Sequence, residues 1–190
     1  MARGTLSSLD ALPLLSSGAA IKPIDLATIF REHGPFVHRL LHRLGVRPAD
    51  VDDAFQEVFV VIHRRLPEFE PEAAVRPWVY GICVRVASRQ RRRPSTTREV
   101  AAEEASEPID PTTPIDAIAA KQARHALQGI LDQIDDDKRD VYVLHELEEL
   151  SISEIAEVLD CPVQTAYSRL RAARTAVAAA VRRYRLREGL

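Results

Sequence analysis

Amide, hydroxyl and guanidinium side chains recur at helical spacing near the end of this 190-residue chain, where they could bind DNA. On an α-helix, residues 164, 167, 168, 171 and 174 would share one face, opposite an apolar one. Side chains of these kinds form hydrogen bonds with base edges in the major groove of a duplex. The predicted duplex-binding residues are Gln164, Thr165, Tyr167, Ser168, Arg169, Arg171 and Arg174.

Two short helices and a tight turn must position this set. Ser151 and Glu154 form an S-x-x-E pattern, which predicts a capping box at the start of the first helix. Pro162 disfavours the helical conformation at Cys161, so the first helix ends there and a second one begins. A helix-turn-helix of this kind places its second helix in the major groove. The alternative interpretation is an ordinary helical hairpin with a solvated basic face.

A second polar set lies on one face of a helix that is predicted over residues 50–66. Asp53, Gln56 and Glu57 stand at i, i+3 and i+4, opposite a strongly apolar face. Such a stripe can dock on a basic surface of another protein. Acidic residues in the first turns of a helix also stabilise it through its dipole, and from the residues alone this capping role is favoured.

Aromatic and basic residues gather further along, where single-stranded nucleic acid could bind. Trp78 lies in a predicted helix over residues 76–93, and Phe69 lies in the loop before it. Aromatic rings can stack on bases while arginines contact the phosphates. A single tryptophan more often belongs to the core, and this is the expectation for the indole itself. The predicted single-strand-binding residues are Phe69, Arg76, Trp78, Arg85, Arg89 and Arg92.

The sequence offers little support for catalysis or for a bound cofactor. It has no phosphate-binding loop and no nucleophile or zinc-protease motif, so no enzyme activity is expected. His38 and His42 lie one helical turn apart but lack a third ligand at a useful spacing, so no metal site is predicted. Cys83 and Cys161 are expected to be reduced thiols in a cytosolic protein. No apolar run is long enough for membrane insertion.

Charge is strongly segregated along the chain, although the net charge is only −2. Seven arginines and no acidic residue occur in 165–187, and five arginines and no acidic residue occur in 85–93. Between these stretches, residues 94–116 carry one arginine, six acidic residues and four prolines, which predicts a flexible linker. Two basic clusters that are separated in this way indicate two anionic contacts.

The periodicity predicts an all-α chain of two small helical domains. The expected segments are a flexible leader over residues 1–23, a first domain over 24–93, the acidic linker over 94–116 and a second domain over 117–187. In the first domain, Phe30 is expected to face inward with its apolar neighbours. In the second, Ile118 is expected to face the core, and one helix is predicted over residues 137–148.

In their order, these motif blocks resemble the bacterial sigma factors of the extracytoplasmic-function (ECF) group. The resemblance rests on DVDDAFQEVFVVIHRRLPEF and RPWVYGICVRVASRQRRR, then the acidic linker, then DDDKRDVYVLHELEELSISEIAEVLDCPVQTAYSRLRAAR. It extends from residue 24 to about residue 183. Factors of this group are subunits that give RNA polymerase its promoter specificity.

The resemblance implies a role for each set of residues. Asp53, Gln56 and Glu57 match the part of region 2 that docks on the clamp helices of the polymerase β′ subunit, which reverses the preference for capping. Phe69 and the helix after it match the part that melts the −10 element and holds a flipped base of the non-template strand. The helix-turn-helix matches region 4, which reads the duplex −35 element and contacts the β flap. Such factors are often held by an anti-sigma factor.

The turn of the helix-turn-helix departs from the family pattern. The run from Leu159 to Pro162 stands where Leu-Gly-(Ile/Val)-Ser is usual. Asp160 must therefore adopt the left-handed conformation that glycine usually supplies. Because Tyr167 stands where lysine is common, the −35 preference of relatives does not transfer to this chain.

Two other functions stay open beside the sigma resemblance. A stand-alone helix-turn-helix regulator would bind duplex DNA as a dimer without acting as a polymerase subunit. A protein-interaction adaptor would keep the fold but would not bind DNA. The arginines retained in the second half of the chain argue against the adaptor.

Overall fold

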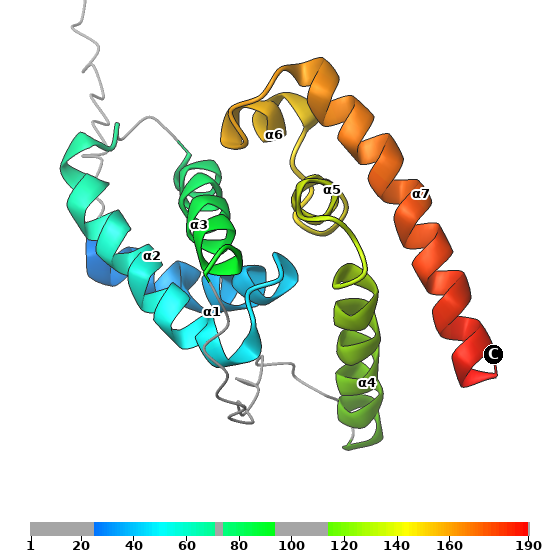
Figure 1. The fold of residues 1–190 in the computed structure, drawn as a ribbon. Coiled ribbons are helices and arrows are strands. Elements are labelled where there is room, and N and C mark those ends of the chain that lie inside the picture. Colours follow the sequence, from blue (N-terminus) through cyan, green and yellow to red (C-terminus); the bar gives the residue numbers. More distant parts are fainter. Residues whose placement is uncertain (1–24, 71–73, 94–113, 190) are drawn as a thin grey trace, which may run out of the picture.

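Helices make up the described part of the molecule. The structure, a computed structural model, describes residues 25–70, 74–93 and 114–189 (Figure 1). Seven α-helices follow one another over these residues, and no strand occurs among them. The predicted all-α fold class is therefore confirmed. The expected leader and most of the expected acidic linker lie outside the described residues.

The N-terminal half consists of α1 (Leu26–Arg43), α2 (Val51–Arg65) and α3 (Val75–Arg91). The carboxyl of Asp25 caps α1 by accepting a hydrogen bond of 2.6 Å from the backbone N–H of Thr28. Acidic residues begin α2 and basic residues end it, an order that stabilises the helix through its dipole. Each helix buries an apolar face against the other two, and Leu40, Ile62 and Val79 are fully buried between them.

The expectation that Phe30 faces inward is wrong. Its side chain is 52% exposed. The ring packs at the edge of the bundle against Phe55 and Phe59 of α2, with centroid distances of 5.8 and 4.9 Å. Because α2 covers only one side of Phe30, the apolar stripe of α1 is wider than the surface that its neighbours bury.

The C-terminal half consists of α4 (Pro114–Leu131), α5 (Asp136–Tyr142), α6 (Ile152–Val158) and α7 (Val163–Glu188). The single helix expected over residues 137–148 is instead α5 followed by a π-helical turn, Val143–Leu147. The wider turn is closed by a hydrogen bond from the backbone N–H of Glu148 to the carbonyl of Val143. It changes the direction of the chain and leads it from α5 into α6.

The expectation that Ile118 faces a core is also wrong, since this residue is 60% exposed. Helix α1 contacts α4 near the end of α4, where Gln128 Nε2 donates to the carbonyl of His42 at 2.9 Å. Ile118 lies almost three helical turns before that contact. The start of α4 therefore extends beyond the helix that covers its end.

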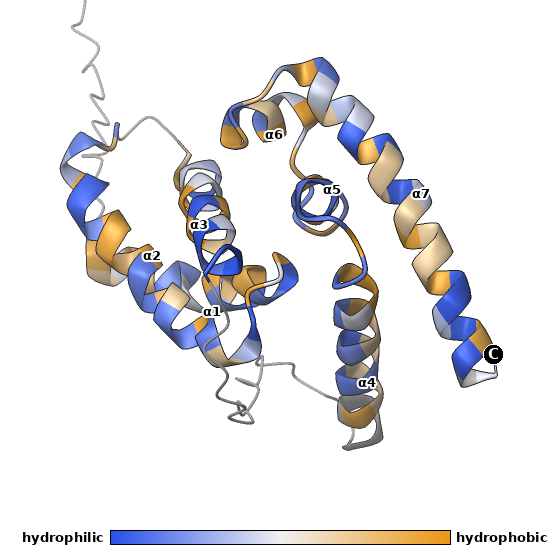
Figure 2. Ribbon diagram, viewed as in Figure 1, coloured by the Kyte–Doolittle hydropathy of each residue, from blue (hydrophilic) through white to orange (hydrophobic). Residues whose placement is uncertain are grey.

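The two halves share one hydrophobic core rather than two separate ones. Buried side chains of α1, α2, α3, α5 and α6 belong to the same cluster, and α3 lies against α6 (Figure 1). The hydropathy colouring of Figure 2 shows hydrophobic and hydrophilic residues alternating along these helices, as is typical of amphipathic packing. None of the described helices is long and apolar enough to cross a bilayer.

Candidate nucleic-acid interface

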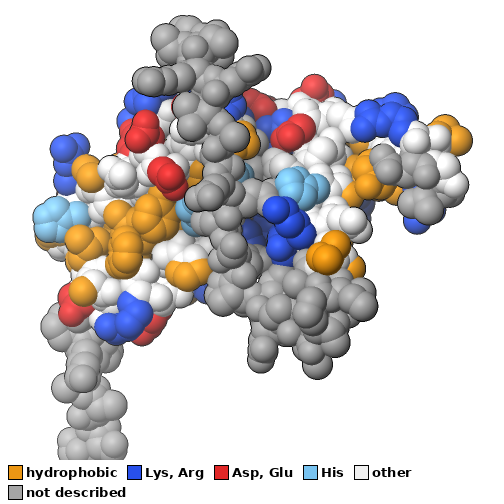
Figure 3. All heavy atoms as spheres, turned by 90° about the horizontal axis from the view of Figure 1, so that it is seen from below, with side chains coloured by type: hydrophobic (Ala, Val, Ile, Leu, Met, Phe, Trp, Pro, Cys, Tyr) orange, Lys and Arg blue, Asp and Glu red, His pale blue; other side chains and the backbone are white. Residues whose placement is uncertain are grey.

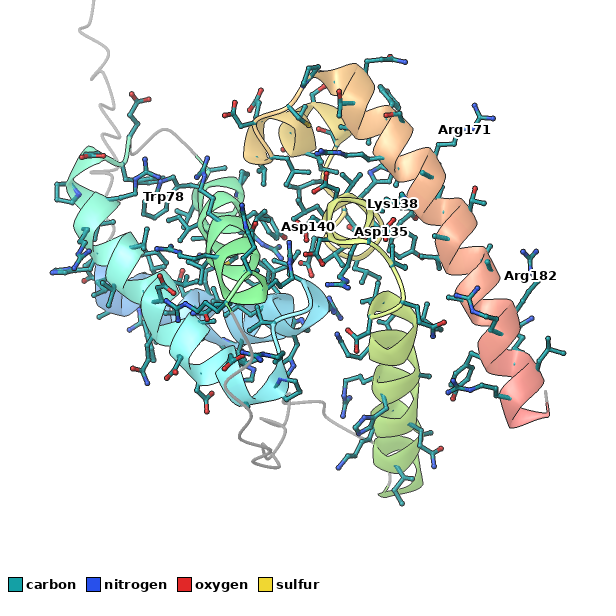
Figure 4. All side chains as sticks on the ribbon, in the orientation of Figure 1. Trp78, Asp135, Lys138, Asp140, Arg171 and Arg182 are labelled. Atoms are coloured by element: carbon teal, nitrogen blue, oxygen red, sulfur yellow. The ribbon has the colours of Figure 1, made fainter. Side chains whose placement is uncertain are left out.

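Four of the predicted duplex-binding residues lie side by side on the exposed face of α7. Gln164, Tyr167, Ser168 and Arg171 are all exposed, and Tyr167 is 56% exposed. Arg171 projects away from the body of the molecule (Figure 4) and forms no ion pair among the described residues. The first turns of α7 therefore present amide, phenol, hydroxyl and guanidinium groups to solvent in one stripe, here called the recognition stripe.

Capping and turn geometry hold the recognition stripe in place. Both hydrogen bonds of the predicted capping box are present, from the Glu154 N–H to Ser151 Oγ at 3.3 Å and from the Ser151 N–H to the Glu154 carboxylate at 2.8 Å. These interactions lower the pKa of Glu154. Asp160 has a φ of 50°, as its place in the turn predicted. Pro162 then occupies the position just before α7 begins, and the helix-turn-helix is confirmed.

Two of the predicted arginines at the edges of the stripe are held by acidic residues of the same half. Arg169 Nη2 lies 2.6 Å from Asp137 Oδ2, and Arg174 Nη2 lies 2.7 Å from Glu146 Oε1. Both pairs are at the surface, where ion pairs contribute little stability and are readily exchanged. The remaining predicted residue, Thr165, is half-buried.

A shallow groove beside the recognition stripe runs between α5 and α7. It is lined by Lys138 of α5, by Ser168, Arg171 and Thr175 of α7, and by three alanines of α7. Lys138 of α5 lines this groove together with Arg171, and its Nζ donates to Oδ2 of Asp135, the residue just before α5, at 2.5 Å (Figure 4). Lys138, which the sequence did not single out, thus adds a second cation to this surface.

The predicted base-stacking residues meet at the N-terminal end of α3. Phe69 and Trp78 pack on each other, with ring centroids 4.9 Å apart and 49° between the ring planes. Trp78 is half-buried against the core. Arg76 places its guanidinium 5.2 Å from the centroid of Phe36. Phe69 and Trp78 thus form a small aromatic surface at the start of α3, which is suited to stacking on an unpaired base.

The other predicted arginines of α3 are engaged to different degrees. Arg89 Nη1 lies 3.0 Å from Glu57 Oε1 of α2. Arg92 donates within its own helix to the carbonyl and the hydroxyl of Ser88, at 3.2 and 2.6 Å. Arg85 is exposed and has no ion pair within the described part of the chain. Among these three, Arg85 is therefore the arginine most available to a phosphate.

The acidic stripe predicted on α2 divides into an outer and an inner part. Asp53 and Gln56 are exposed, and Val60, one turn further along the same face, is 47% exposed. Glu57 is half-buried and accepts a hydrogen bond from Gln90 Nε2 of α3 at 2.9 Å. Glu57 therefore braces α2 against α3, while the other three residues form an open surface, here called the α2 surface.

Sequence reasoning missed a group of buried polar contacts between the two halves. Glu148 accepts from Arg43 Nη1 at 2.9 Å and from the Tyr80 hydroxyl at 3.0 Å. Asp140 and Arg91 form a buried pair with contacts of 3.0 and 2.9 Å. Burial raises the pKa of Asp140 to about 6, although the Arg91 charge acts in the opposite direction. The partners lie at least 49 residues apart in the sequence, so no local pattern could reveal them.

The groups that could serve metal or thiol chemistry are dispersed. The described residues include no group of three or more His, Cys, Asp or Glu side chains that could hold a metal ion. Cys83 is buried in α3, where burial raises the pKa of its thiol, and Cys161 lies half-exposed in the turn before α7.

The sequence matches two family profiles over the two halves described above. Residues 29–97 match Sigma-70 region 2, and residues 124–177 match Sigma-70, region 4. The first match contains most of α1 and all of α2 and α3. The second extends from α4 into α7 and includes the recognition stripe.

The fold is similar to those of two solved proteins. CnrH, in complex with the cytosolic domain of CnrY, is 23% identical, with a TM-score of 0.60 over 82% of this chain and 86% of its own. The sigma factor RpoE of Bartonella quintana, in complex with the anti-sigma factor NepR, is 15% identical, with a TM-score of 0.56 over 80% of this chain and 96% of its own. These identities support a likeness of fold. No curated protein matches the sequence.

Proposed function

We propose that this chain, which belongs to the sigma-70 family and has the region 2 and region 4 architecture of its ECF group, directs core RNA polymerase to specific promoters. The observation that carries the proposal is the presence of both regions in one chain, with a solvent-facing recognition stripe on region 4. The protein would act in the cytoplasm as a non-catalytic subunit, while the polymerase performs the chemistry.

In region 4, helix α7 would read the −35 element from the major groove. Gln164 can form paired hydrogen bonds with adenine, and Arg171 can do so with guanine. Lys138 beside them is placed to contact a phosphate and so fix the register. The surface ion pairs of Arg169 and Arg174 contribute little, so these cations can turn to the DNA backbone.

In region 2, the start of α3 would hold the melted −10 element. The rings of Phe69 and Trp78 offer a surface on which a flipped base of the non-template strand can stack. Stacking on an aromatic side chain contributes about 1–3 kcal/mol per base. This would offset part of the cost of unpairing, which is a few kcal/mol. Arg85 of α3 and Arg92, which directly follows the helix, are exposed and would contact the strand's phosphates.

The α2 surface would dock on the clamp helices of the β′ subunit. Asp53, Gln56 and Val60 are exposed in one row along α2, and a combination of polar and apolar side chains is typical of protein interfaces. Glu57 would contribute by fixing α2 against α3 rather than by direct contact. Region 4 would contact the β flap of the same polymerase.

An anti-sigma factor is a further proposed partner. Both similar solved proteins were captured with a second protein, the cytosolic domain of CnrY in one case and the anti-sigma factor NepR in the other. Hydrophobic side chains gather on the α1 and α2 side of the molecule (Figure 3), where Phe30 and Val60 are exposed. These side chains would provide apolar contacts for such a partner.

In vitro transcription with purified core polymerase tests the proposal. We expect specific initiation from a subset of genomic fragments only when this chain and the core enzyme are both present. Replacing Asp53 by Lys together with Gln56 by Ala should reduce co-purification with core by more than about tenfold, because a cation and a methyl group would replace the docking contacts. Glu32→Lys, at an exposed acid of α1 outside the α2 surface, is the matched control.

The competing function predicts different results in the same preparation. A stand-alone regulator would give no specific initiation, a dimeric mass by light scattering and a footprint with two-fold half-sites. A sigma factor would be monomeric and would bind promoter DNA tightly only together with core.

A further inference from the structure

We propose that Val163 and Tyr167, two exposed apolar residues at the start of α7, bind the C5-methyl groups of thymines in the −35 element. The inference rests on the proposed function and deepens it, because it names the base that this part of the helix selects. It is carried by the exposure of the two side chains, by their spacing and by their place in the first turns of α7.

The two side chains are largely open to solvent. Val163 is 44% exposed and Tyr167 is 56% exposed. Among the described residues, the Tyr167 hydroxyl forms no hydrogen bond and its ring contacts no other aromatic ring. Single exposed hydrophobic residues are common on protein surfaces and need no explanation. Two of them within one turn, at the start of the second helix of a helix-turn-helix, indicate a contact surface.

Helical spacing puts this pair on the face that carries the recognition stripe. Val163 lies four residues before Tyr167, and Arg171 lies four residues after it. Residues four apart are neighbours on one face of an α-helix, with Cβ atoms about 5–6 Å apart. Tyr167 therefore lies between Val163 and Arg171, and the exposed Gln164 and Ser168 lie beside this row.

The charges around the pair favour one way of approach for DNA. Lys138 and Arg171 line the groove between α5 and α7 and attract phosphates. A separate hollow, at the turn before α7, is lined by Val163 together with the exposed Glu157 and Asp160. Carboxylates repel the phosphates of DNA. The phosphate backbone is therefore directed toward Lys138 and Arg171, and Val163 is left to meet base edges.

The place of the pair along the helix also assigns it to base edges. In a helix-turn-helix, the N-terminal residues of the second helix contact the bases in the major groove. There the base edges present donors and acceptors, and the one methyl group among them is that of thymine. Val163 forms no side-chain hydrogen bond, and the ring of Tyr167 presents an apolar surface. Thymine is therefore the base whose edge matches both residues.

The tyrosine also explains why this chain would differ in preference from similar proteins. Lysine is common at the position of Tyr167, and a lysine binds guanine or a phosphate. The phenol ring carries no charge and replaces that preference with an apolar one. Successive base pairs are about 3.4 Å apart, so two side chains one turn apart cover about two pairs. We expect one contacted thymine, with a second one favoured beside it.

Selection of DNA followed by removal of single methyl groups tests the contact. A pool of random duplexes is bound by the chain together with core polymerase and, separately, by the full chain alone. Each thymine shared by the retained duplexes is then replaced by 2′-deoxyuridine, which lacks only the methyl group. Because a buried methylene contributes about 0.8 kcal/mol, we expect about a fourfold loss of affinity at the contacted thymine and no loss at the others.

Protein variants show whether the lost affinity comes from the proposed contact. Removing the methyl group can also alter the shape of the duplex, and such an effect would not depend on these two side chains. In the double variant Val163→Ala with Tyr167→Ala, the thymine and uracil duplexes should bind equally. Tyr167→Phe keeps the ring and should retain the fourfold difference. Leu186→Ala is the matched control, since Leu186 is a hydrophobic residue that is 81% exposed near the other end of α7.

Cytosine analogues provide an independent test of the same contact. Replacing the contacted thymine by cytosine removes the methyl group and exchanges an acceptor for a donor. Replacing it by 5-methylcytosine makes the same exchange but keeps the methyl group. We therefore expect the wild-type protein to bind the 5-methylcytosine duplex about fourfold more tightly than the cytosine duplex. The double variant should bind the two duplexes equally.

The outcomes are distinct for the methyl contact and for the proposed function. Equal binding of thymine and uracil duplexes by the wild-type protein, or a fourfold loss that persists in the double variant, overturns the contact and leaves the sigma function standing. The fourfold loss on paired half-sites that are bound by the chain alone, without promoter-specific transcription, refutes the sigma function and supports the contact. If neither preparation selects a common sequence, both are refuted.

Discussion

The two basic helices, α3 and α7, present their arginines in opposite ways. In α3, Arg76 and Arg91 approach carboxylates that belong to the other domain. In α7, Arg169 and Arg174 pair only with acids of their own domain, and Arg171 is exposed without an ion pair among the described residues. One basic helix is thus partly built into a domain contact, whereas the other faces solvent.

This difference teaches that a run of arginines does not by itself define a DNA-binding surface. The two helices have the same sequence signature, which is arginines without acidic neighbours. Their roles diverge because region 4 supplies buried carboxylates to α3 and none to the recognition stripe.

The largest expected effect that sharpens this comparison is a difference in reactivity between the two cysteines, one in each region. Cys83 is fully buried and its thiol pKa is raised by burial, while Cys161 is half-exposed. The thiolate is the reactive form, so Cys83 should react only when the region 2 core opens. Because such openings cost at least about 5 kcal/mol, Cys161 should be labelled more than about a thousandfold faster. Mass spectrometry of timed labelling measures the ratio, and similar rates would mean that the region 2 core is loose.

Core truncation in each region tests whether the two regions unfold together. Leu40→Ala in region 2 and Ile155→Ala in region 4 each remove a fully buried side chain and should cost about 2–5 kcal/mol of unfolding free energy. Since the core is shared, Ile155→Ala should also lower the denaturation midpoint of region 2. The single tryptophan, Trp78, reports that midpoint by fluorescence. An unchanged Trp78 transition in Ile155→Ala would show that the regions unfold independently.

A smaller effect is expected from removing one base contact of the recognition stripe. Arg171→Ala should weaken binding to a −35 duplex by about 1–3 kcal/mol, because a paired contact with a base is lost. Arg182→Ala is the matched control, since Arg182 is also exposed on α7 but lies three turns further from the turn (Figure 4). Fluorescence anisotropy at fixed salt compares the two variants. Equal losses of DNA affinity in the two variants would show that Arg171 contributes only general electrostatic attraction and no base contact.

The smallest effect is expected at the cap that positions the helix-turn-helix. Ser151→Ala removes the side chain that accepts from the Glu154 N–H and should cost about 0.5–2 kcal/mol of stability. Ser153→Ala, at an exposed position inside the same helix, should be neutral or slightly stabilising because alanine is the better helix former. Thermal denaturation of both variants measures the difference. A similar loss of stability in both variants would show that the effect comes from the surface of the helix and not from the cap.

Features that depend on a few consecutive residues were predictable. The Ser151–Glu154 capping box, the left-handed Asp160 and the start of α7 after Pro162 all follow from local hydrogen bonding and sterics. The exposure of Phe30 and Ile118 was not predictable in this way. Periodicity identifies the apolar side of a helix, but it does not say how far a neighbouring helix covers that side.

The sequence by itself determined the all-α fold class, the helix-turn-helix and the order of the two family regions, because these depend on local backbone preferences and short-range periodicity. Only the tertiary structure decided which charges meet. Glu57 is turned inward to Arg89, and Glu148 is buried against Arg43, a residue 105 positions away. The state of a charged side chain depends on its burial and on its partners in space, and neither is encoded in the neighbouring residues.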